Sequence, residues 1–85
     1  MSAGPKPQRL TLVMRTDCGL CDEMLAEVTA LGRQYPLPGM ALADVDADPQ
    51  LQQRWGLKVP VLLLDGTLVC SGRLQSRELL RLLRL

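Results

Sequence analysis

Residues 15–25 read RTDCGLCDEML and place two cysteines, Cys18 and Cys21, three positions apart. The residues before this stretch, RLTLVM at 9–14, form a short apolar run that is typical of a buried strand. The residues that follow, 21–34, repeat apolar side chains at helical spacing and predict an amphipathic helix. The cysteine pair is therefore expected where a strand ends and a helix begins.

A strand-to-helix junction favours redox chemistry at such a pair. A helix N-terminus carries about half a positive charge and several unpaired N–H groups, which stabilise a thiolate and lower its pKa below the free value of about 8.5. Cys21 lies one turn further on the same face, so the two sulfurs can meet in a disulfide. Cys18 is then the outer, attacking thiol, and Cys21 resolves the mixed disulfide. The carboxylates that flank the pair, Asp17, Asp22 and Glu23, repel a thiolate. Arg15 opposes this repulsion and is expected to help stabilise the Cys18 thiolate.

Two other interpretations of the pair remain open from the residues alone. The two thiols can be incidental core residues, since free cysteine is among the most buried residue types. They can also be half of a metal site, but a structural zinc takes four ligands, and the chain has no histidine and only Cys70 besides. The sequence therefore predicts no metal site. Cys70 is interpreted as a buried, inert thiol, and Trp55 as a core residue rather than a ligand platform.

The rest of the chain predicts further alternating elements. Strands are expected over residues 40–46, 59–64 and 67–71, and helices over residues 49–55 and 75–85. Asp48 is expected to cap the helix that opens with Pro49, and Ser76 is a candidate cap for the last helix. Asp65-Gly66 is a two-residue hairpin turn. The order β-α-β-α-β-β-α predicts an α/β domain with a four-stranded mixed sheet and helices on both faces.

Length and composition limit the class of protein. The 85 residues fit one domain, expected at residues 9–85, after a disordered N-terminal tail at residues 1–8. Ten basic and nine acidic residues give a net charge of +1, which argues against nucleic-acid or membrane binding through bulk charge. The longest apolar run, residues 59–64, is far shorter than the ~20 residues of a membrane span. No signal peptide is visible, and three cysteines do not form a secreted disulfide framework. We therefore expect a cytoplasmic monomer.

A proline opens the predicted third strand, in the sequence Lys58-Val59-Pro60. It can be a strand-start proline after an ordinary trans bond. It can also follow a cis bond beside the cysteine pair, which would turn the Val59 backbone outward to pair with an extended substrate.

A strand, a C-x-x-C at a helix start and a later V-P pair together resemble the thioredoxin superfamily. No extra strand and helix precede the first strand, and this arrangement is closest to that of glutaredoxins. Residues 44–66, DVDADPQLQQRWGLKVPVLLLDG, are similar to the small bacterial glutaredoxin-like proteins. The resemblance covers residues 9–85 and implies a thioredoxin-like (glutaredoxin-like) fold.

The resemblance also implies roles for particular residues. Cys18 is the nucleophile and Cys21 the resolving cysteine. Arg15 corresponds to the family's basic residue that helps to hold glutathione. Pro60 corresponds to the family's cis-proline, and Val59 to the backbone that pairs with glutathione.

Other positions depart from the glutaredoxin pattern. The family's C-P-Y-C is C-G-L-C here, so Leu20 replaces the tyrosine that walls the glutathione groove. Lys58 replaces a threonine, Ser71-Gly72 stands for a double glycine, and Gln75 replaces an aspartate that binds glutathione. Glutathione as the partner therefore does not follow, although Lys58 and Arg73 could attract its carboxylates.

These expectations combine into one functional hypothesis and one alternative. The hypothesis is a dithiol thiol–disulfide oxidoreductase that acts on a disulfide-containing protein or on glutathione, without a cofactor other than glutathione as a co-substrate. Its catalytic residues are Cys18 and Cys21, and its expected substrate-binding residues are Arg15, Lys58, Val59, Pro60, Ser71 and Gly72. The alternative is a redox-weak binding module that docks a peptide or protein in the groove between Cys18 and Pro60.

Overall fold

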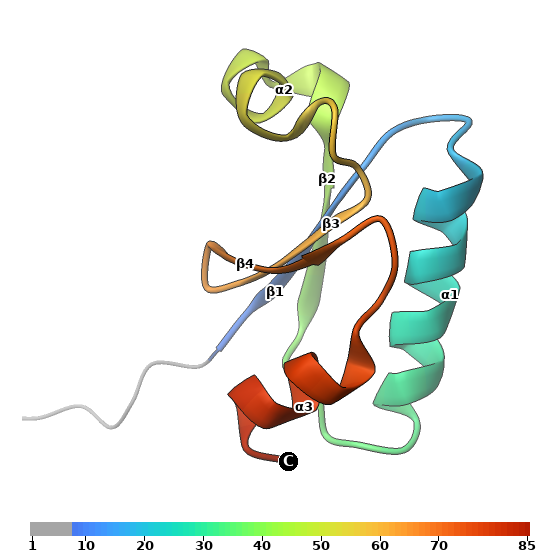
Figure 1. Cartoon of the computed structure of the whole chain (residues 1–85), viewed down its shortest axis with the longest axis vertical. Coiled ribbons are helices and arrows are strands. Elements are labelled where there is room, and N and C mark those ends of the chain that lie inside the picture. The colour runs from blue at the N-terminus through green and yellow to red at the C-terminus, as the bar shows by residue number, and fades with distance from the viewer. Residues whose placement is uncertain (1–7) are drawn as a thin grey trace, which may run out of the picture.

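The computed structural model describes residues 8–85, so all but the last residue of the tail expected at 1–8 lies outside the described residues. The elements, in chain order, are β1 (Leu10–Met14), α1 (Gly19–Gly32), β2 (Met40–Asp44), a short 3-10 helix η1 (Val45–Ala47), α2 (Pro49–Trp55), β3 (Val61–Leu64), β4 (Thr67–Ser71) and α3 (Ser76–Leu83). The predicted order β-α-β-α-β-β-α is confirmed, with η1 as an addition (Figure 1).

The four strands form one mixed sheet in the order β2-β1-β3-β4. β1 pairs in parallel with β2, with Leu10 beside Met40, and in an antiparallel manner with β3, with Val13 beside Val61. β3 and β4 form the antiparallel hairpin. Within the described chain, β2 and β4 are the two edges of the sheet.

Two apolar clusters hold helices to the two faces of this sheet. On one face, α1 and α3 pack on the strands through the buried residues Leu10, Leu12, Met24, Val28, Leu62, Cys70 and Leu79. On the other face, α2 packs through Val13, Val45, Trp55, Val61 and Leu63. Trp55 is 7% exposed, which confirms its expected place in the core. Helices therefore cover both faces, as predicted.

The predicted turn and cap residues act locally as expected. The Asp48 carboxylate accepts the Gln50 backbone N–H at 2.8 Å, and Pro49 is the first residue of α2. Asp65 and Gly66 join β3 to β4 with φ values of 50° and 83°. Two consecutive residues with positive φ give the turn whose twist matches that of a β-hairpin.

Most element boundaries differ by one or two residues from the sequence prediction; α1, for example, spans Gly19–Gly32 rather than residues 21–34. β2 ends at Asp44, because the Asp44 carboxylate accepts the Asp46 backbone N–H at 2.9 Å and starts the 3-10 turn. β3 begins at Val61 rather than at residue 59. At α3 the cap position is Gln75, without a side-chain capping bond, so the expectation that Ser76 caps this helix was wrong. No helix within residues 8–85 combines the length and apolarity needed to cross a membrane.

Candidate active site

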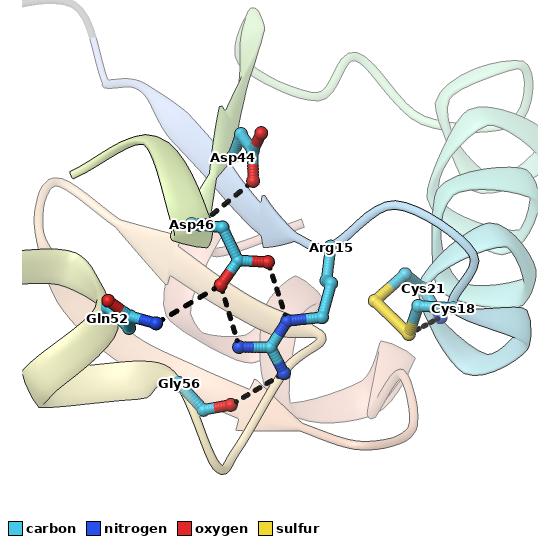
Figure 2. A network of polar contacts seen from close by, with 7 residues as sticks. All are labelled: Arg15, Cys18, Cys21, Asp44, Asp46, Gln52 and Gly56. Atoms are coloured by element: carbon cyan, nitrogen blue, oxygen red, sulfur yellow. Dashed lines mark hydrogen bonds and ion pairs between the residues drawn. A yellow bond between two sulfur atoms is a disulfide. The ribbon is translucent and has the colours of Figure 1, made fainter. Parts of the chain in front are cut away.

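The cysteine pair lies at the start of α1, as the sequence predicts. Cys18 is the N-cap residue, in extended conformation, and its sulfur accepts the Cys21 backbone N–H at 3.2 Å. The two sulfurs form a disulfide, with Cα atoms 5.2 Å apart (Figure 2). Cys18 is partly exposed, whereas Cys21 is 0% exposed. A reagent in solvent therefore reaches the outer sulfur first.

The sheet brings a second group of predicted residues to the same end of the molecule. Val61 pairs with Val13 of β1 and with Ser71 of β4, so Pro60 lies beside the end of β1 from which the cysteine loop departs. The Val59–Pro60 peptide bond is cis, and the Gly72 backbone N–H donates to the Pro60 carbonyl at 2.8 Å. Pro60 and Gly72 are therefore neighbours, although they are far apart in sequence.

Lys58 lies on the α2 side of this region. Its side chain is exposed, and its ammonium group is 5.9 Å from the centre of the Trp55 ring. Its backbone N–H donates to the Trp55 carbonyl at 2.8 Å. Lys58 is thus an exposed cation in the connection between α2 and β3.

Arg15 is bonded to residues outside the predicted site (Figure 2). Its guanidinium donates to both carboxylate oxygens of Asp46, from Nε at 2.8 Å and from Nη2 at 3.1 Å. Its third contact runs from Nη1 to the Gly56 carbonyl at 3.0 Å. Hydrogen bonding to Arg15 holds the pKa of the Asp46 carboxyl below its usual value, and the same bond raises the pKa of Arg15. In this oxidised state, Arg15, which was expected to help stabilise the Cys18 thiolate, is thus paired with Asp46.

Sequence reasoning missed Asp46, but a signal for it exists. The last residue of β2 is Asp44, and the segment after it carries two more carboxylates at residues 46 and 48. Arg15 follows the neighbouring strand β1. Parallel strands end at the same edge of a sheet. A cation and carboxylates in these positions could therefore have been expected to meet.

Two open grooves flank the start of α1. One, of about 380 Å³, runs between α1 and the segment after β4, and is lined by Leu20, Glu23, Ala26, Glu27, Gly72 and Arg73. The other, of about 460 Å³, lies on the β2 side, and is lined by Met14, Arg15, Thr16, Asp17, Asp22, Leu42, Ala43 and Asp44. Leu20, the residue between the cysteines, is 47% exposed. Neither groove is lined by Cys18, Cys21 or Pro60, although each includes residues that are next to the cysteines in sequence.

The third cysteine is separate from this site. Cys70 is a free thiol, 7% exposed, and it faces Leu62 across the sheet register. Burial raises the pKa of the Cys70 thiol. This confirms that Cys70 is a buried residue. Among residues 8–85, no three side chains of histidine, cysteine, aspartate or glutamate gather closely enough to bind a metal ion.

The sequence matches the family model of the Glutaredoxin-like domain (DUF836) over residues 9–84. The solution NMR structure of protein Ne2328 from Nitrosomonas europaea is 25% identical, with a TM-score of 0.74 over 91% of this chain and 92% of that one. A crystallographic target protein from X. campestris is 29% identical, with a TM-score of 0.60 over 88% of this chain and 95% of that one.

The fold is also similar to that of a thioredoxin. Oxidised mitochondrial thioredoxin 3 from Saccharomyces cerevisiae has a TM-score of 0.61 and 24% identity, over 85% of this chain and 74% of that one. The search of curated proteins finds no match.

Proposed function

Because the chain belongs to the Glutaredoxin-like domain family and has a thioredoxin-like fold, we propose that it is a small dithiol thiol–disulfide oxidoreductase. The observation that supports this proposal most directly is the disulfide between a partly exposed Cys18 and a buried Cys21. A reversible dithiol needs one sulfur that substrates can reach and a second sulfur within bonding distance of the first.

The proposed reaction is two successive thiol–disulfide exchanges. The Cys18 thiolate attacks one sulfur of the substrate disulfide, that S–S bond breaks, and the leaving thiolate takes a proton from solvent. Cys21 then loses its proton and attacks the Cys18 sulfur, which releases the second substrate thiol and leaves the Cys18–Cys21 disulfide. An external dithiol supplies the two electrons that return the pair to its reduced form. This cycle suits the cytoplasm, where thiols are kept reduced.

The substrate is proposed to lie across the end of the sheet beside Cys18. Pro60, Ser71 and Gly72 meet there through the β3–β4 pairing and the bond from Gly72 to Pro60. Val59 precedes them in the chain. Of the remaining proposed contacts, Lys58 is an exposed cation, whereas the charge of Arg15 is paired with Asp46. A disulfide-containing protein or a glutathione mixed disulfide is the proposed partner.

Variants of the two cysteines test the proposal. The assay is the reduction of insulin disulfides and, separately, of a glutathione mixed disulfide, with dithiothreitol as the electron source. Cys18→Ser should abolish both activities, because the accessible thiol is lost. Cys21→Ser should accumulate a covalent adduct between Cys18 and the substrate, visible by mass spectrometry. Cys70→Ala is the matched control and should retain activity. Equal activity of Cys18→Ser and the natural chain would refute the proposal.

A second candidate function is a peptide-binding module on the same fold. The groove between α1 and the segment after β4, with the exposed Leu20 on its wall, favours this candidate. This groove is not the expected one between Cys18 and Pro60, because neither residue lines it. A Cys18→Ser/Cys21→Ser double variant separates the two candidates. A binding module keeps its affinity for partners captured by the natural chain, whereas an oxidoreductase loses partners held through Cys18.

A further inference from the structure

The Arg15–Asp46 pair joins three segments that surround the cysteine loop. Arg15 follows β1 directly, Asp46 lies in η1 after β2, and Gly56 ends α2. Arg15 bonds to both of the others, and Gln52 of α2 adds a bond from Nε2 to Asp46 at 3.4 Å. The guanidinium is therefore held by acceptors from two different segments, the Asp46 carboxylate and the Gly56 carbonyl, and does not move independently with the cysteine loop.

The direction of the Arg15 side chain matters for the sulfur chemistry. Figure 2 shows the guanidinium turned toward Asp46 and Gly56, with the disulfide on the other side of the Arg15 side chain. Arg15 is three residues before Cys18 in the same connection. A long arginine side chain released from Asp46 has the reach to turn toward that sulfur. Asp46 also cancels the charge that Arg15 would otherwise project into the site.

We propose that Asp46 is a positioning residue that holds Arg15 away from Cys18 and thereby makes the Cys18–Cys21 disulfide a weaker oxidant. The inference rests on the proposed thiol–disulfide function, and it names a residue that controls how readily the pair accepts electrons. Reduction adds two electrons and two protons to the disulfide, and the outer thiol can then release its proton to become a thiolate. A cation beside that thiolate stabilises the reduced form and raises the reduction potential. Because Asp46 keeps Arg15 paired, it prevents this stabilisation of the reduced form.

The reduction potential of the pair is the first measurement. The full chain is equilibrated in buffers of reduced and oxidised glutathione, and its reduced fraction is measured by alkylation and mass spectrometry. Asp46→Ala should shift the equilibrium constant about tenfold toward the reduced form, which corresponds to about 30 mV for a two-electron couple. Asp46→Asn should shift it less, because the amide oxygen still accepts a bond from Arg15.

A double-variant comparison identifies the route of the effect. In an Arg15→Gln background, Asp46→Ala should change the constant by less than about twofold, since the cation that Asp46 restrains is gone. Glu78→Gln is the matched control. Glu78 also binds an arginine through both oxygens, at 2.8 Å each, but on α3. It should leave the constant unchanged.

Each outcome has a defined meaning. An unchanged constant in Asp46→Ala and Asp46→Asn, with urea unfolding showing both variants folded, would overturn the proposal. An equal shift with and without Arg15 would also overturn it, because Asp46 would then act directly. The potential is an equilibrium property of the pair, so it can be measured even if no substrate is turned over. Failure of this inference is therefore distinguishable from failure of the proposed function.

Discussion

The backbone N–H of Cys21 points at the Cys18 sulfur from 3.2 Å, so the N-terminal cap of α1 is a sulfur atom rather than an oxygen. The same N–H, together with the helix dipole, can stabilise a negative charge on Cys18 after reduction. Cys18 is thus both the N-cap residue of α1 and the proposed nucleophile.

We therefore predict that the Cys18 thiol titrates below the value of about 8.5 for free cysteine. The rate of alkylation by iodoacetamide, followed by mass spectrometry between about pH 5 and pH 10, measures this titration. Cys21 and Cys70 should react much more slowly in the folded chain, because both are buried. An unfolded peptide of residues 15–25 is the control. A Cys18 midpoint at or above that of the peptide would contradict the prediction.

A second prediction concerns stability at alkaline pH. Burial raises the pKa of Cys70 above that of a free cysteine, so the unfolded chain releases this proton at a lower pH than the folded chain. Over that window the unfolded state binds fewer protons, and the free energy of unfolding falls as pH rises. Urea unfolding of the oxidised protein, followed by Trp55 fluorescence, should show this fall, and Cys70→Ala should show less of it. Equal slopes for both proteins would exclude Cys70 as the cause.

The attachment of α3 gives a third prediction. Leu79 is 0% exposed and lies in the cluster with Leu10 and Leu12, whereas Leu82 on the same helix is 37% exposed. Leu79→Ala should cost about 2–5 kcal/mol of unfolding free energy. A domain of this size has roughly 4–13 kcal/mol in total. Leu82→Ala should cost less than about 1 kcal/mol. Similar urea midpoints for the two variants would show that Leu79 does not anchor the helix.

A fourth prediction tests the cap of α2. Asp48→Ala removes the acceptor for the Gln50 N–H and should cost about 1 kcal/mol of unfolding free energy. Asp48→Asn keeps an oxygen acceptor at the same position and should recover most of that loss. Urea unfolding of both variants provides the measurement. If Asn is as destabilising as Ala, the carboxylate acts by its charge and not as a cap.

Much of the fold could be predicted from short patterns of adjacent residues. The Asp65-Gly66 turn, the Asp48-Pro49 helix start and the cysteine pair at a strand-to-helix junction depend on residues adjacent in sequence, and all three are confirmed. The end of β2 was missed because Asp44 bonds to the backbone of Asp46 and ends the strand early. Apolar alternation continues to Val45, which is buried although it lies outside the strand.

The site was predictable only in part for a related reason. The cysteine positions follow from one stretch of chain, but the partner of Arg15 lies 31 residues away. Which carboxylate binds Arg15 depends on how β2 ends and where α2 begins. Sequence spacing alone does not contain that information. The neighbourhood of Pro60 and Gly72 likewise depends on the register of the hairpin.

The sheet order places β2 at an edge of the sheet, and this has a consequence for handling the protein at high concentration. Within the described chain, the outer backbone edge of β2 has no neighbouring strand, and Leu42 on this strand is 57% exposed. An open edge with an apolar side chain is a template for strand addition by another chain, and hence for self-association at high concentration. A lysine in place of Leu42 would protect this edge in concentrated samples, because charged side chains on edge strands oppose such pairing.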